Sequence, residues 1–181
     1  SDAHLTISDL SYAYLANAYL YTSNFKNAYL RYSNLTNVNL HQADLTNAKL
    51  GYVNLADADL TGANMAKTIL GYANLRNANL FSADLSNVNL YEADLTNADL
   101  READLTNVNL RNADLTYASL FCAYMTIAHL STADLTNSYL RYADLTGADF
   151  TSATVTNANF YATTWSNTVW TNGNTYNTNQ A

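Results

Sequence analysis

Three histidines and one cysteine are the side chains of this 181-residue chain best suited to metal or nucleophilic chemistry. A metal site needs several such ligands close together, and a catalytic triad needs a base beside its nucleophile. His4, His41 and His129 lie far apart and fall at different outward positions of the repeat described below. Neither neighbour of Cys122 carries a positive charge that would activate the thiol. Phosphate-binding glycine loops and the H-E-x-x-H and G-x-S-x-G motifs are absent. The sequence therefore predicts no catalytic residue, no metal ligand, no cofactor and no enzyme activity.

The carboxylates form the first candidate surface, because seven of them lie between residues 84 and 114. Only Arg101 and Arg111 oppose them in this stretch. The zone is either a solvated acidic surface or a face that binds a partner, with a cation site as a third alternative. The residues of this predicted acidic face are Asp84, Glu92, Asp94, Asp99, Glu102, Asp104 and Asp114.

The composition excludes several classes of partner. A formal charge of −7 and a pI near 4.5 argue against direct binding to nucleic acid phosphates or to an anionic membrane. No apolar run approaches the roughly 18 residues that a transmembrane helix requires. The chain starts Ser-Asp-Ala without a recognisable signal peptide, so an export signal could have been removed. Localisation therefore stays open between the bacterial cytoplasm and an exported location.

An uninterrupted five-residue repeat must position all of these side chains. From Leu5 to Trp170, 26 of the 34 positions divisible by five are Leu, and the other eight are also large and apolar. Two residues before each stands Ala, Ser, Val or Thr. A helix would scatter a five-residue period around its axis, and a continuous strand would alternate it between faces. The apolar spacing of two and then three instead indicates short extended segments joined by corners.

The outward positions show how many corners close one turn. Tyr12, Tyr32, Tyr52 and Tyr72 recur every twenty residues, as do Thr96, Thr116, Thr136 and Thr156. Such ladders arise when equivalent residues stack in successive coils. Twenty residues are four pentads, so the sequence predicts a four-sided coil. The Tyr ladder is a second candidate surface for binding a partner, because exposed Tyr offers contact area at low entropy cost. The alternative is that the stacked rings only stabilise the β-helix.

The units A-D-L-T-N, A-N-L-R-N and A-D-L-S-N resemble the pentapeptide-repeat proteins, whose consensus is A(D/N)LXX. The resemblance covers about Ala3 to Trp170 and implies an all-β fold, a right-handed four-sided parallel β-helix of about eight coils. We expect a single β-helix over 1–170 and an irregular tail over 171–181. In the last coils, about 150–170, aromatic residues replace Leu and predict either a cap or a homodimer interface. These residues are Phe150, Phe160, Tyr161, Trp165 and Trp170.

A closed core and ladders of surface residues favour a non-enzymatic scaffold that presents flat faces to a protein partner. The resemblance adds an alternative, since some family members are acidic rod-shaped dimers that mimic DNA and bind a type II topoisomerase. Those members inhibit gyrase or protect it from quinolones. The charge of −7 fits that alternative, whereas the Leu-centred units and the lack of an inserted loop count against it. The sequence does not identify the partner.

Overall fold

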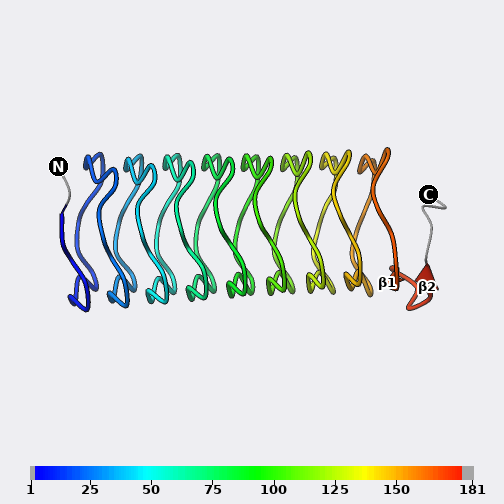
Figure 1. Ribbon diagram of the computed structural model, residues 1–181, viewed down its shortest axis with the longest axis horizontal. Coiled ribbons are helices and arrows are strands. Elements are labelled where there is room, and N and C mark those ends of the chain that lie inside the picture. The colour runs from blue at the N-terminus through cyan, green and yellow to red at the C-terminus, as the bar shows by residue number, and fades with distance from the viewer. Residues whose placement is uncertain (1–2, 177–181) are drawn as a thin grey trace.

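The computed structural model describes residues 3–176 and shows a rod of stacked coils with the two ends of the chain at opposite ends of the rod (Figure 1). Parallel bridges join residues twenty positions apart, from His4 and Asn24 to Asp149 and Val169. Each coil therefore contains four pentads, as predicted. The rod is a right-handed four-sided β-helix, the fold of the solved structures compared below. No helix in the described range is long and apolar enough to cross a membrane.

The core consists of the inward ladders that the repeat predicts. Every position divisible by five from Phe25 to Phe150 is fully buried, and the small residues two before them are almost as inaccessible. Leu5, Leu10, Leu15 and Leu20 are only partly buried, because they belong to the first coil of the described residues. The small residues let opposite walls approach, so the large side chains fill the interior.

Each corner is a tight turn with one residue in the left-handed region. The turn over Leu95 closes when the N–H of Ala98 donates to the carbonyl oxygen of Leu95 at 2.9 Å. Its third residue, Asn97, has φ +58°, and φ stays between +53° and +63° at all such non-glycine positions. Left-handed backbone costs most residues about 1–2 kcal/mol, and Asn tolerates it better than others. This explains why Asn is the commonest residue there, and why 181 residues need only five glycines.

Backbone hydrogen bonds between coils hold the corners in register. In one representative pentad the N–H of Asp94 donates to the preceding coil at Ala73, at 3.0 Å. The N–H groups of Leu95 and Asn97 donate to the following coil at Asp114 and Thr116, at 2.7 and 3.0 Å. The pairing recurs pentad after pentad, so each coil is a template for the next.

The C-terminal end differs from the predicted irregular tail. β1 (Thr168–Val169) and β2 (Thr175–Tyr176) pair antiparallel and form a hairpin at this end of the rod (Figure 1). Gly173 adopts φ +82°, and Trp170 accepts its N–H at 2.9 Å. The dipeptide Asn172-Gly173 is a strong hairpin signal that the prediction of a tail overlooked. The remainder of the predicted tail, 177–181, lies outside the described residues.

The left-handed corners generate a stability prediction at Ile127, a β-branched residue at φ +58° with half of its side chain exposed. Ile127→Asn should raise the free energy of unfolding by about 1 kcal/mol, because Asn tolerates this conformation. The reverse change one coil earlier, Asn107→Ile, should lower it by a similar amount. It also removes the hydrogen bond from Asn107 to Asn87, 2.9 Å long. Urea unfolding measures both, and a stabilising Asn107→Ile would contradict this account of the corners.

Candidate functional site

The predicted acidic face is not one face, and the structure corrects this interpretation. Asp84 and Asp104 pair on one side of the rod, and Asp94 and Asp114 pair ten residues further on, half a coil away. Residues spaced by five or ten fall on different sides when one coil takes twenty. The seven carboxylates therefore lie on three of the four sides and at two corners of the middle of the rod, a zone called the acidic belt here. Its members are Asp84, Glu92, Asp94, Asp99, Glu102, Asp104 and Asp114.

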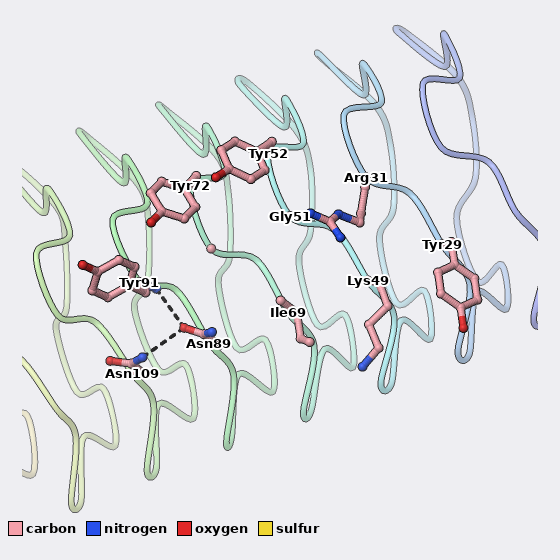
Figure 2. A pocket seen from close by; sticks show the side chains of 11 residues that line it. Tyr29, Arg31, Lys49, Gly51, Tyr52, Ile69, Tyr72, Asn89, Tyr91 and Asn109 are labelled. Carbon is pink, nitrogen blue, oxygen red and sulfur yellow. Dashed lines mark hydrogen bonds between the residues drawn. The ribbon is translucent and has the colours of Figure 1, made fainter.

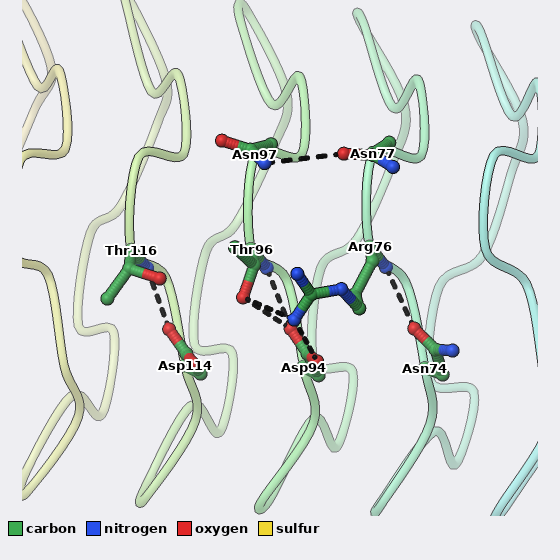
Figure 3. Close-up of polar contacts among 8 residues, drawn as sticks. All are labelled: Asn74, Arg76, Asn77, Asp94, Thr96, Asn97, Asp114 and Thr116. Atoms are coloured by element: carbon green, nitrogen blue, oxygen red, sulfur yellow. Dashed lines mark hydrogen bonds and ion pairs between the residues drawn. The ribbon is translucent and has the colours of Figure 1, made fainter.

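Most aspartates of the acidic belt are engaged in their own corners (Figure 3). The Oδ1 atom of Asp94 accepts from the N–H of Thr96 at 3.0 Å and from its hydroxyl at 2.6 Å. Asp114 accepts the N–H of Thr116 at 2.9 Å in the same way. The motif Asp-Leu-Thr is thus a local turn device in which the side chain satisfies a backbone donor.

Two arginines neutralise part of the acidic belt. Arg76 reaches one coil along the rod to Asp94, where its Nη1 lies 3.1 Å from Oδ2 (Figure 3). Arg101 holds Asp99 through two contacts of 2.6 and 2.7 Å. Burial raises the pKa of Asp94, but hydrogen bonds from Thr96 and Arg76 outweigh it and hold that pKa below the ordinary 3.8.

The Tyr ladder is assembled as predicted. Tyr12, Tyr32, Tyr52 and Tyr72 stack with ring centroids 5.2, 5.0 and 4.6 Å apart and planes within 11° of parallel. Tyr91 ends the ladder with its ring edge-on to Tyr72 at 5.7 Å. All four stacked rings remain exposed, from 75% at Tyr12 to 43% at Tyr72. The stack therefore forms a fixed aromatic ridge along one corner of the rod.

Four of the five predicted C-terminal aromatics form a cluster that fills the end of the core. Phe150, Phe160, Trp165 and Trp170 contact one another with centroids between 4.8 and 6.0 Å apart. Tyr161 does not join them, because its position one residue after a core residue points outward. Its ring is 62% exposed and lies 5.1 Å below the guanidinium carbon of Arg141. The cluster and the hairpin together cover the end of the core.

A groove of about 560 Å³, which was not predicted from the sequence, lies beside the Tyr ladder (Figure 2). Gly51 and Gly71 lie at its centre, one coil apart. They belong to one column, that is, a set of residues spaced by twenty that stack in successive coils. Other members of this column are Arg31, Tyr91 and Arg111. The signal was present as two glycines twenty residues apart. It becomes visible only when the sequence is written in columns of twenty.

Metal-ligating side chains do not converge in the part of the chain that the structure describes. His4, His41 and His129 occupy three different columns, and residues 3–176 hold no group of three His, Cys, Asp or Glu that could bind a metal ion. Cys122 is a partly exposed free thiol at a left-handed corner position. The surfaces that the fold builds are the acidic belt, the Tyr ladder and the groove.

The sequence model for pentapeptide repeats matches this chain in eight copies, over residues 1–37, 23–62, 58–97, 93–126 and 128–171. The chain belongs to the pentapeptide-repeat family. A sequence search of curated proteins gave no significant match. The family assignment therefore rests on the repeat itself and on the architecture that it builds.

Several solved structures are similar to this chain. Rfr23 from the cyanobacterium Cyanothece 51142 is 38% identical over 51% of this chain and 63% of its own, with a TM-score of 0.50. QnrB1, a plasmid-mediated fluoroquinolone resistance protein, is 15% identical over 88% of this chain and 78% of its own, with a TM-score of 0.51. HetL from Nostoc sp. strain PCC 7120, involved in heterocyst differentiation regulation, is 27% identical over 96% of this chain and 92% of its own, with a TM-score of 0.39. The likeness to QnrB1 shows a shared fold.

Asp94 should make the stability of this pentapeptide-repeat rod depend on acid. Because its pKa is lower in the folded chain, Asp94 stabilises the fold above its ordinary pKa of 3.8, and this contribution is lost as the pH falls through the lower value. Asp94→Asn keeps an acceptor for Thr96 but loses the charge opposite Arg76. Urea midpoints at about pH 7 and about pH 3 should therefore differ less in the variant.

The control for this measurement is Asp114→Asn, which keeps the same kind of corner. The structure places no ion pair on Asp114 among the described residues. The urea midpoint of Asp114→Asn should depend on pH more nearly as that of the unsubstituted chain does. Equal effects of the two substitutions would mean that Arg76 contributes nothing to the acid sensitivity.

The aromatic cluster predicts unequal effects of two neighbouring truncations. Trp165 is 6% exposed, and its indole N–H donates to Thr163 at 2.6 Å, so Trp165→Ala should cost about 3–5 kcal/mol. Tyr161→Ala, at the exposed corner, should cost about 1 kcal/mol or less. Hydrogen exchange of the last two coils measures both. If the amides of the last two coils are as well protected from exchange in Trp165→Ala as in Tyr161→Ala, the aromatic cluster does not act as a cap.

Proposed function

We propose that this pentapeptide-repeat protein is a non-enzymatic scaffold that presents its flat faces to a protein partner. The observation that carries the proposal is the Tyr ladder, a row of exposed rings fixed against one another along one corner. Rings already held in place lose little conformational entropy when a partner covers them. Tyr is also among the residues that dominate binding energy at protein interfaces.

The closed core supports a surface function. Most inward positions between Phe25 and Phe150 are filled by apolar side chains, and the backbone groups pair between coils. The buried hydroxyls of Ser33 and Ser138 donate to the carbonyl oxygens three residues earlier at 2.6 and 2.7 Å, whereas those of Ser23 and Thr68 have no hydrogen-bond partner among the described residues. The outward side chains differ from coil to coil, so a partner would recognise the rod through contacts with them.

The alternative proposal is a DNA mimic that binds a type II topoisomerase. The acidic belt favours it, because aspartates lie on three of the four sides of the middle of the rod. The fourth side carries Asn89 and Asn109 instead, so the negative charge does not surround the rod as phosphates surround a duplex. The engagement of Asp94 and Asp99 by Arg76 and Arg101 weighs against it, since these pairs reduce the negative charge offered to a partner.

Supercoiling by purified gyrase separates the two proposals. The scaffold predicts neither inhibition nor protection from a quinolone when the protein is added up to micromolar concentrations. Glu92→Gln with Glu102→Gln is the matched variant for any effect seen, because neither glutamate caps its corner as the aspartates do. Inhibition by the unsubstituted rod that weakens in this variant would support the mimic and overturn the scaffold.

Site-specific photocrosslinking in the native cell tests the scaffold directly. A crosslinking residue at position 52, inside the Tyr ladder, should capture one defined protein. The same residue at position 117, a Tyr at a different corner of the rod, is the control and should not capture that protein. Identical captures from both positions, or none from position 52, would contradict recognition through the Tyr ladder.

A homodimer through the C-terminal coils is part of the proposal. The partly exposed Trp170 and Tyr176 supply apolar surface at this end. Light scattering should show a dimer that dissociates in Trp170→Ala. A chain that is already a monomer before substitution leaves the aromatic cluster with the role of a cap alone.

A further inference from the structure

The groove beside the Tyr ladder has the features of a site for a small ligand (Figure 2). It extends across several coils, with Gly51 and Gly71 at its centre, the Tyr ladder along one side and Ile69 beside the glycines. Arg31 and Lys49 lie toward its N-terminal end, and Tyr91 lies toward the other. Its volume of about 560 Å³ is within the range of known ligand pockets, about 300–1,000 Å³.

The corner geometry does not require either glycine. Neither Gly51 nor Gly71 has positive φ, and a Cβ added at each would come no closer than 3.8 Å and 3.6 Å to other atoms, which is ordinary contact. The same column carries serine at Ser11 and Ser131 and threonine at Thr151. The two glycines therefore leave a strip without side chains of its own at the floor of the groove, called the bare strip here. Both glycines are buried by their neighbours, so a flat group over the strip packs against the side chains that border it.

The aromatic side of the groove presents ring edges. Tyr52 and Tyr72 stack face to face at 4.6 Å, so their faces cover each other and their edges border the groove. The edge of an aromatic ring carries partial positive charge and favours a π face or an anion. Tyr91 is held in place, edge-on to Tyr72 and with its hydroxyl accepting from Asn112 at 3.1 Å.

The two cations of the groove have no acidic partner. Neither Arg31 nor Lys49 takes part in an ion pair among the described residues, whereas Lys26, Arg76 and Arg101 do. The Nε atom of Arg31 lies 3.8 Å from the place where a Cβ of Gly51 would be, so the guanidinium stands at the edge of the bare strip. In a chain of charge −7, this groove offers a local concentration of positive charge.

We propose that the groove binds a flat organic anion of about the size of two fused rings. The anionic group lies between Arg31 and Lys49, and the rings lie over the bare strip between the Tyr edges and Ile69. Arg31 and Tyr91 are three coils apart, which is about 14 Å at the usual strand spacing. Because side chains border the groove at both ends, a free compound of limited length fits better than a peptide that runs through. This site is independent of the scaffold proposal.

Three probes separate the contributions of charge and ring. 1-Naphthyl phosphate has both features, 1-naphthol has the rings alone, and inorganic phosphate has the charge alone. Isothermal titration of the full chain should detect 1-naphthyl phosphate with at least roughly tenfold higher affinity than either of the others, because only it contacts both the two cations and the bare strip. Equal affinities for all three probes, or no binding at millimolar 1-naphthyl phosphate, would falsify the proposal.

Variants locate the binding. Arg31→Gln with Lys49→Gln should weaken 1-naphthyl phosphate by roughly tenfold or more. Arg111→Gln, which removes a cation from the same column but outside the groove, should leave the affinity unchanged. Loss of binding in Arg111→Gln as large as in the double variant would show that net charge, and not this site, attracts the probe.

Filling the groove is the independent test. Gly51→Thr with Gly71→Thr places side chains on the bare strip at positions where the column accepts threonine, and should abolish binding while the rod stays folded by circular dichroism. Ala56→Thr with Ala66→Thr introduces two threonines at the same pentad position on two other corners, outside the groove, and is the control. Unchanged affinity in the filled variant would overturn the proposal.

Discussion

The hydrogen bonds between coils are the interaction on which the rest of this rod depends. Because each backbone pairs with the backbone twenty residues away, a side chain is stacked directly against its equivalent in the next coil. The same register that stacks Tyr52 on Tyr72 joins the amides of Asn37 and Asn17 at 2.8 Å. A periodic sequence thereby forms a set of parallel ladders. The residues spaced by twenty in each ladder determine the surface of that part of the rod.

This register also limits what the side chains are free to do. The corners need left-handed residues and acceptors for exposed N–H groups, and Asn and Asp supply both. Asp94 and Asp114 are therefore structural parts of their corners before they are part of any acidic surface. Features that the corners do not explain, such as Gly51, Gly71 and the unpaired Lys49, are where we expect recognition of other molecules.

The stacking of coils ends differently at the two ends of the described rod. At the C-terminal end the aromatic cluster takes the place of the Leu layers, and the hairpin of β1 and β2 replaces the next coil. At the N-terminal end, Leu5 and Leu20 are only partly buried and no hairpin covers them within residues 3–176. The two ends of the described rod therefore differ in how well they protect the apolar interior.

The sequence by itself determined the pentad, the four-sided coil, the inward ladders and the stacking of Tyr12 to Tyr72, because a strict period leaves only one way to bury Leu at every fifth position. It also predicted that aromatics such as Trp165 fill the last coils. Tertiary structure alone paired Arg76 with Asp94, turned the ring of Tyr91 edge-on to Tyr72 and opened the groove at Gly51. These features depend on neighbours about one coil away in the sequence, and only the stacking of coils brings such residues into contact.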